Sequence, residues 1–239
     1  MTIFESSRIR PVARKLLRGA KRLRGHVVLR LGRIGATRPL SAWSGFDRGL
    51  PIDRYYIERF LAQHKADIRG RVLEAGDDNY SRRFAGGPID RQDVLNIDLG
   101  RPATTIAGDL ADPGTLPEGA FDCVLLTQTL QYVFDVPAAL ANIRRSLRPG
   151  GVALLTFPGI APISPDDWRD HFYWRFTAPS VERLLAGAFD PGKVEVFPFG
   201  NMYAATAFLH AAAAQEVETK KLQPVMPDYA IVIAARAVA

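Results

Sequence analysis

The chain has 239 residues, of which 47% are apolar and 23% are charged, as in a soluble globular protein. No apolar stretch approaches the 18 or more residues of a membrane-spanning helix, and the N-terminus lacks the apolar core of a secretory signal. The length is enough for one α/β domain with an extension. The single cysteine, Cys123, cannot form an internal disulfide, which fits a reducing cytosol, and it is interpreted as a core residue. The four histidines are scattered and no Cys/His spacing fits zinc, so no metal site is predicted.

Positive charge is concentrated at the N-terminus. Residues 1–40 hold 11 Lys or Arg and one acid, a net charge of +10, whereas the rest of the chain has a net charge of −4. Apolar residues recur at steps of three and four from Ile9 to Ile34, on an arc roughly 100° wide, with nearly all the basic residues outside it. This pattern predicts a basic amphipathic helix over residues 8–34 on an anionic membrane surface, followed by a linker that ends near residue 40. A helix packed on a partner and an RNA-binding arm are the alternatives.

From residue 41 onward, strand and helix patterns alternate, which predicts a second, larger unit over residues 41–239. This alternation favours an α/β fold with a doubly wound, mostly parallel sheet and helices on both faces. Asp53 is predicted to cap the first helix and Thr177 a later one. The predicted strands are 72–73, 93–98, 104–109, 121–127, 152–157, 194–198 and 229–238, and the predicted helices are 53–64, 138–147, the segment after Thr177, and 202–217.

The stretch after the first strand is a candidate ligand loop. Glu74 precedes Gly76, and a glycine lets the backbone approach a ligand closely because it has no Cβ. The loop has this single glycine in place of a G-x-G-x-x-G pattern. Asp77 and Asp78 disfavour a pyrophosphate, so a ligand with a positive centre suits this loop better.

Two further acids end the next two predicted strands. Asp98 lies 22 residues past Gly76, the spacing of one βαβ step, where an acid accepts hydrogen bonds from ribose hydroxyls. Asp109, with Leu110 as an apolar wall beside it, suits an adenine. A loop cap is the alternative for Asp98, and turn formation before Asp112 is the alternative for Asp109.

Two aromatic segments are candidates for the ligand edge of the sheet. Residues 166–176 combine aromatic and charged side chains and are predicted to cover the substrate. Within them, His171 is the best candidate general base because imidazole titrates near neutral pH, and Asp170 is a weaker one. A hydrogen-bonded structural histidine is the alternative. Residues 43–57 are interpreted either as a ligand-lining loop or as a flap packed on the domain.

The order of these motifs resembles the class I S-adenosylmethionine-dependent methyltransferases across about residues 70–160. The motifs are a strand with Glu-x-Gly, a strand ending at Asp98, Gly-Asp109-Leu, Phe-Asp-x-Val-Leu-Leu, and Leu-Arg-Pro-Gly-Gly before a strand. Residues 47–57, 173–177 and 200–201 extend the resemblance to a bacterial, methyltransferase type 11-like subgroup. Its members often accompany glycosyltransferases of cell-surface glycan assembly.

This resemblance implies a Rossmann-like, seven-stranded sheet and S-adenosylmethionine as the cofactor. In this family the first loop wraps the methionine part, the second acid holds the ribose, and the third strand's acid and the next residue hold the adenine. The sequence departs from the family where Asp77, Asp78 and Asn79 replace further glycines. The implied cofactor-binding residues are Glu74, Gly76, Asp98, Asp109, Leu110 and Gln128.

The implied chemistry is in-line attack on the sulfonium methyl group. No Asn/Asp-Pro-Pro-aromatic run follows the fourth strand, where residues 128–131 stand instead, which disfavours methylation of nucleobase amino groups. We therefore expect a cytoplasmic O-methyltransferase for a sugar or cell-surface glycan intermediate, peripheral at the inner face of the membrane. A glycosyltransferase is a candidate partner, and nucleic acid is not expected. The alternatives are a binding module without turnover and an RNA methyltransferase that uses the basic N-terminal segment, residues 1–40, called the leader below.

Overall fold

The computed structural model describes residues 36–101, 103–164 and 168–239. The predicted helix over residues 8–34 lies outside the described residues, so that prediction stays open. In the part of the chain that the structure describes, no helix combines the length and apolar character needed to cross a membrane.

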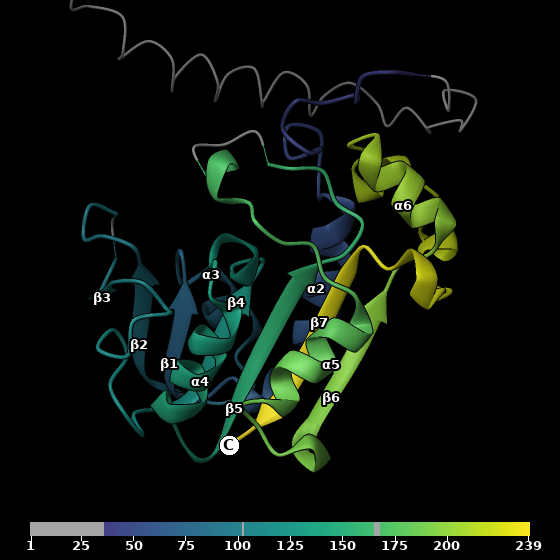
Figure 1. Ribbon diagram of the computed structural model, residues 1–239. Coiled ribbons are helices and arrows are strands. Elements are labelled where there is room, and N and C mark those ends of the chain that lie inside the picture. The colour runs from purple at the N-terminus through teal and green to yellow at the C-terminus, as the bar shows by residue number, and fades with distance from the viewer. Residues whose placement is uncertain (1–35, 102, 165–167) are drawn as a thin grey trace, which may run out of the picture.

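A seven-stranded sheet forms the centre of the molecule, with strand order β3-β2-β1-β4-β5-β7-β6 (Figure 1). β7 runs antiparallel to both of its neighbours, and the other pairings are parallel. The predicted doubly wound, mostly parallel and Rossmann-like sheet is therefore confirmed. The strands are β1 (Gly70–Ala75), β2 (Ile89–Asn96), β3 (Ile106–Ala107), β4 (Phe121–Thr127), β5 (Leu147–Pro158), β6 (Val194–Phe199) and β7 (Val232–Val238).

Helices cover both faces of this sheet, as predicted. Successive strand residues point to opposite faces, so Leu73 joins one apolar core and Val72 the other. The first core packs on α4 and α5 and the second on α2 and α6. The helices are α2 (Ile52–Gln63), α3 (Asn79–Phe84), α4 (Val136–Ser146), α5 (Ala178–Ala186) and α6 (Met202–Leu209).

The helix boundaries confirm one predicted cap and correct another. Thr177 caps α5 in a reciprocal arrangement with Ser180, as its position predicted. Asp53 does not cap α2, because the helix already begins at Ile52 after Pro51. Asp53 lies in the first turn instead, where its Oδ1 accepts a hydrogen bond from the backbone N–H of Arg54 at 2.8 Å.

The predicted helix over 202–217 is too long, because α6 ends at Leu209. Ala211 adopts a left-handed φ of 56°, which breaks the helical path despite the alanine-rich sequence. The following residues turn back toward the segment before α2, where the Ala214 N–H donates to Leu50 O at 2.7 Å. This long-range pairing outweighs local helix propensity.

Two strands differ from their predicted limits, which changes where the acids lie. β2 begins at Ile89 rather than at residue 93, because its polar first half pairs with β1, and it ends at Asn96. β3 is reduced to Ile106–Ala107 at the sheet edge. Asp98 and Asp109 are therefore loop residues just past the ends of these strands.

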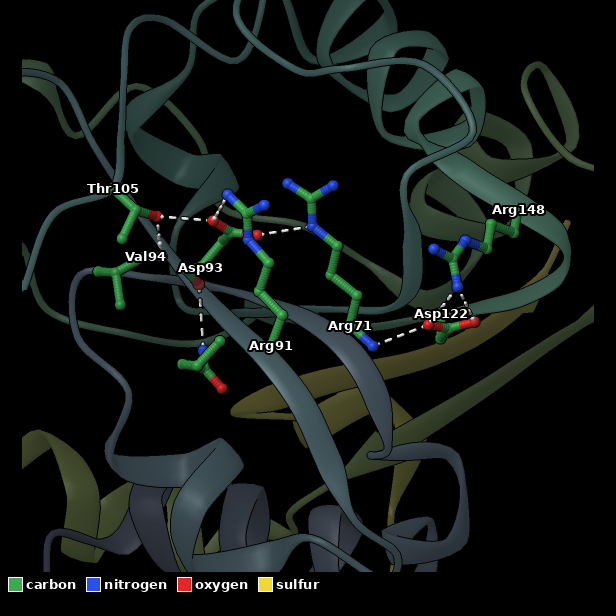
Figure 2. A network of polar contacts seen from close by, with 8 residues as sticks. Arg71, Arg91, Asp93, Val94, Thr105, Asp122 and Arg148 are labelled. Atoms are coloured by element: carbon green, nitrogen blue, oxygen red, sulfur yellow. Dashed lines mark hydrogen bonds and ion pairs between the residues drawn. The ribbon is translucent and has the colours of Figure 1, made fainter.

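A buried carboxylate links β1, β2 and the segment before β3 (Figure 2). The Asp93 side chain is 1% exposed and accepts from Arg71 Nε at 2.7 Å, Thr105 Oγ1 at 3.0 Å and Arg91 Nη2 at 3.2 Å. Burial alone would raise the pKa of Asp93, but the hydrogen bonds from Arg71 and Thr105 and the arginine charges outweigh it, so this pKa is lowered. Asp122 accepts from the Arg71 backbone N–H on the other side.

Candidate active site

The chain changes direction across the sheet between β1 and β4. It leaves β1 toward β2 and β3 on one side, and from β4 it continues to β5 on the other. Such a reversal opens a crevice at the carboxyl ends of the two neighbouring strands, where open α/β sheets bind ligands. In Figure 1 the segment that precedes α5 and the segment that precedes α2 both lie beyond this edge.

Glu74, near the end of β1, holds the start of α3 in place. The residue is 2% exposed, and its carboxylate accepts hydrogen bonds from the backbone N–H groups of Tyr80 at 3.1 Å and Ser81 at 2.8 Å. Burial raises the pKa of Glu74 to about 7, although the hydrogen bonds from Ser81 and Tyr80 oppose the shift. The negative charge of Glu74 is therefore costly in the protein alone, and a nearby cation would stabilise it.

Gly76 borders open space. Its φ is 91°, a left-handed conformation that favours glycine, and a Cβ built here would meet no atom within 4 Å. Its N–H donates to Leu95 O at 2.9 Å, which fixes the loop to β2. A rigid backbone beside open space matches the predicted approach of a ligand.

The two aspartates that replace the family's glycines have partners within the loop. Asp77 accepts from the backbone N–H of Asn79 at 3.0 Å and from its side-chain amide at 2.6 Å. Asp78 forms an ion pair with Arg82 one turn along α3. These contacts stabilise the loop by hydrogen bonds where the family uses glycines.

Asp98 and Asp109 are exposed and both close local turns. Asp98 Oδ1 accepts from the Gly100 N–H at 2.7 Å, and Asp109 Oδ1 accepts from the Ala111 N–H at 2.9 Å. These are the turn roles that the sequence left as alternatives. The structure brings both acids to the edge that carries Glu74, because β1, β2 and β3 are parallel neighbours.

Leu110 was expected to present an apolar surface to the ligand, but its side chain is buried. Its side chain is buried in the core that includes Leu95 and Leu140, and its carbonyl accepts from Asn142 Nδ2 at 2.8 Å. The apolar surface of this residue therefore faces the core, and its main chain continues from Asp109.

Gln128 follows β4 directly and has a left-handed φ of 50°. Its N–H donates to Thr156 O at 3.1 Å, and its carbonyl accepts from Gln131 Nε2 at 2.8 Å. Gln128 Nε2 and Gln131 Oε1 are buried without a hydrogen-bond partner. A buried polar atom left unpaired costs roughly 1–3 kcal/mol, so this pair of amides marks a place for a polar ligand or water. Gln128 was among the predicted site residues, whereas Gln131 was not. The only sequence feature that marks Gln131 is its position just after an apolar strand.

The segment with His171 is attached to this same strand end. The Tyr173 N–H donates to Gln131 O at 2.9 Å, and the Trp174 indole N–H donates to Val133 O at 3.1 Å. His171 is exposed, and its ring centroid lies 5.8 Å from that of Trp168 and 6.1 Å from that of Tyr173. Its neighbour Asp170 is also exposed in the same short 3₁₀ helix.

A cavity of about 360 Å³ lies at the opposite edge of the sheet. It is lined by residues at the amino ends of β1, β4 and β5, including Arg69, Asp122 and Gly150. Its acids are engaged in ion pairs, Asp122 with Arg148 and Asp67 with Arg236. The topology of parallel sheets places ligand chemistry at the carboxyl edge, not here. Among the described residues, no group of three or more His, Cys, Asp or Glu side chains has the arrangement of a metal site.

Comparison with known proteins agrees with this geometry. Residues 79–155, about a third of the chain, match the family model described as a methyltransferase domain. This match runs from α3 into β5. A search of curated proteins gave no match.

Three solved structures are similar in fold to this chain. An S-adenosylmethionine-dependent methyltransferase from Mesorhizobium loti is 16% identical with a TM-score of 0.50, over 78% of this chain and 98% of the other. The Haloferax volcanii complex of the Trm112 methyltransferase activator with a methyltransferase matches at 15% identity with a TM-score of 0.50, over 85% of this chain and 99% of the other. An S-adenosylmethionine-dependent methyltransferase from Archaeoglobus fulgidus is 11% identical with a TM-score of 0.51, over 78% of this chain and 94% of the other. At these identities the likeness shows a Rossmann-like methyltransferase fold, which together with the domain match supports S-adenosylmethionine as the cofactor.

Proposed function

We propose that this protein is an S-adenosylmethionine-dependent methyltransferase that methylates a hydroxyl group of a sugar or cell-surface glycan intermediate. The observation that carries the proposal is the open space beside Gly76 at the switch point, next to the buried acid Glu74. A positive ligand centre there would stabilise the ionised form of this carboxylate, whose pKa burial raises to about 7.

The arrangement fits a nucleoside laid along the sheet edge. Strands lie about 4.8 Å apart, so the tips of β1, β2 and β3 span roughly 10 Å, which is the scale of a nucleoside. In this proposal Glu74 and Gly76 face the methionine part, Asp98 the ribose, and Asp109 with the Leu110 main chain the adenine. Gln128, with its unpaired buried amide, lies at the reacting end.

When bound, the cofactor supplies a methyl group on a positively charged sulfur. The chain then has to orient the acceptor oxygen in line with that methyl group and keep water away, and positioning of this kind supplies much of the rate enhancement. A base that takes the hydroxyl proton adds to it. His171 is the proposed base, with Asp170 as the weaker candidate.

The acceptor class is proposed from the aromatic surface beside this site. Phe134, Tyr173 and Trp174 are exposed, and the ring of Phe134 contacts the rings of the other two. Flat aromatic faces of this kind pack well against the apolar C–H face of a sugar ring. Surroundings of this composition, together with the resemblance to methyltransferases that accompany glycosyltransferases, support a glycan acceptor and a glycosyltransferase partner.

Titration calorimetry with S-adenosylhomocysteine tests the cofactor assignment. We expect one site per chain with a Kd in about the micromolar range, or roughly −8 kcal/mol, as for a typical substrate-sized ligand. Transfer of a labelled methyl group to sugar acceptors, compared with transfer to RNA, then tests the acceptor class. Absence of binding at millimolar ligand would favour a binding module without turnover.

The leader makes a separate, testable contribution at the membrane. We expect that removing residues 1–35 lowers binding to vesicles containing an anionic lipid, because a basic residue near such a surface contributes about 1 kcal/mol. This deletion keeps the Leu40 N–H bond to His210 O at 2.9 Å, so affinity for S-adenosylhomocysteine should not change. Vesicles of neutral lipid alone are the control. Equal vesicle binding by both proteins would remove the membrane role, and salt-dependent RNA binding by the full chain alone would point to nucleic acid.

A further inference from the structure

Arg54, the third residue of α2, is a half-buried cation whose ion-pair partner among the described residues is its chain neighbour Asp53. Its side chain is 23% exposed, and the nearest carboxylate oxygen, Asp53 Oδ2, lies 3.8 Å from its Nε, beyond hydrogen-bond distance. By contrast, Arg83 makes two bonds of 2.6 and 2.7 Å with Glu58. The Arg54 guanidinium hydrogen-bonds the Tyr80 hydroxyl, and within the described ranges no carboxylate lies within hydrogen-bond distance of it, so its other N–H groups can serve an anion.

This guanidinium lies across the carboxyl ends of β1 and β4. Its charge acts on the Tyr80 hydroxyl, at the start of α3, and on Tyr132, just after β4. Burial raises the pKa of Tyr80, and the nearby charge of Arg54 opposes that shift. The Arg83–Glu58 ion pair joins α3 to α2, the two helices that carry Tyr80 and Arg54.

The charges here match one end of the proposed cofactor. S-adenosylmethionine carries a nucleoside at one end and an amino acid, with a carboxylate and an ammonium group, at the other. Asp98 and Asp109 lie past β2 and β3, so a nucleoside held there places the amino acid over the crevice between β1 and β4. At that point the start of α2 offers one cation and one acid side by side.

We propose that Arg54 binds the α-carboxylate of S-adenosylmethionine and that Asp53 lies beside its α-ammonium group, an assignment that rests on the proposed function. The planar guanidinium presents two parallel donors, a geometry that suits a carboxylate better than a lysine ammonium does. The Arg54 guanidinium carbon lies over the ring of Phe46, 5.8 Å from its centroid.

A comparison of two ligands tests this assignment without measuring activity. S-adenosylhomocysteine has the amino-acid end, whereas 5′-methylthioadenosine lacks it and keeps the nucleoside and sulfur. We expect Arg54→Gln to weaken binding of S-adenosylhomocysteine roughly 10- to 100-fold, the effect of losing a charge-assisted hydrogen-bond pair, and to leave binding of 5′-methylthioadenosine unchanged. Arg54→Lys should give an intermediate loss for S-adenosylhomocysteine alone.

Arg59→Gln is the matched control on the same helix. Arg59 is exposed and donates to the Tyr55 hydroxyl at 2.8 Å, so its replacement should change neither affinity. Equal losses of both ligands in Arg54→Gln would show a structural role and overturn the assignment, as would unchanged S-adenosylhomocysteine binding. If Arg54→Gln does not fold, as judged by thermal unfolding, Arg54→Lys decides by the same ligand comparison. A wild-type protein that binds neither ligand would overturn the proposed function and this assignment together.

Discussion

Replacing Arg71 with alanine is expected to lower the free energy of unfolding by about 3 kcal/mol. Asp93 is buried in β2, and Arg71 provides its closest ionic hydrogen bond at 2.7 Å (Figure 2). Removing one partner of a buried ion pair typically costs roughly 3–5 kcal/mol, because the remaining charge is left unpaired. We take the lower end because Arg91 and Thr105 still contact Asp93. Urea denaturation at neutral pH measures the effect.

Arg91→Ala is the matched control, because both arginines contact the same carboxylate. Arg91 is 62% exposed and lies 3.2 Å from Asp93, so its loss should cost less than about 1 kcal/mol. Equal costs for Arg71→Ala and Arg91→Ala would contradict this account of the network.

The pH dependence of stability gives a second readout of the same contact. The pKa of Asp93 is lowered in the folded protein, so its contribution to stability is present above the unfolded pKa and is lost as the pH falls through the folded value. Wild type should therefore lose stability under acid, below about pH 4, more steeply than Arg71→Ala does, since the variant no longer lowers this pKa as far.

The Asp93 network also shows which part of the fold the sequence could not predict. Strands with continuous apolar runs, such as residues 121–127, were predicted correctly because burial on both faces leaves a local signal. The first half of β2 was missed because Asp90, Arg91 and Gln92 look like a loop, and Asp93 is buried only because Arg71 pairs with it from β1. Such a partner, 22 residues away, leaves no local pattern.

In the candidate site too, some residues could be predicted from local sequence and others could not. Glu74 and Gly76 could be predicted because a strand followed by a glycine turn is a local feature, and the left-handed φ of Gly76 confirms the need for glycine there. Arg54 and Gln131 were missed because their importance depends on what lies beside them. Arg54 gains its role only when α2 packs against α3, and Gln131 only when its amide is buried without a partner. The ligand and catalytic roles assigned from the sequence all stay predictions; they concern Glu74, Gly76, Asp98, Asp109, Leu110, Gln128, Asp170 and His171.

Replacing Glu74 with glutamine is expected to remove a pH dependence from both folding and cofactor binding. The folded pKa of about 7 lies above the ordinary 4.5, so the stabilising contribution of this group is complete below about pH 4.5 and is lost as the pH rises through 7. At 1.36 kcal/mol per pKa unit, wild type should lose about 3 kcal/mol relative to Glu74→Gln between pH 4.5 and 8. Urea denaturation across that range measures the difference.

The ionisation of Glu74 should also change the preference of the site between S-adenosylmethionine and S-adenosylhomocysteine. S-adenosylmethionine has a positive sulfur and S-adenosylhomocysteine a neutral one, so an ionised Glu74 should favour the former. We expect the ratio of their affinities to rise by roughly tenfold as the pH increases from 6 to 8 in wild type, about 1.4 kcal/mol, and to stay constant in Glu74→Gln. Calorimetry in two buffers of different ionisation enthalpy should also show proton release on S-adenosylmethionine binding near pH 6.5 in wild type alone.

Ser81→Ala is the control, because it removes the side-chain contact of Ser81 with Glu74 but keeps both backbone N–H donors and the carboxylate itself. It should retain the pH-dependent preference for the positive cofactor, since the group that titrates is still present. If the affinity ratio in wild type did not change with pH, the charge of Glu74 would not face the sulfur. Its function would then be limited to the hydrogen bonds that hold the start of α3, and the positive centre of the ligand would have to lie nearer Asp77 or Asp53.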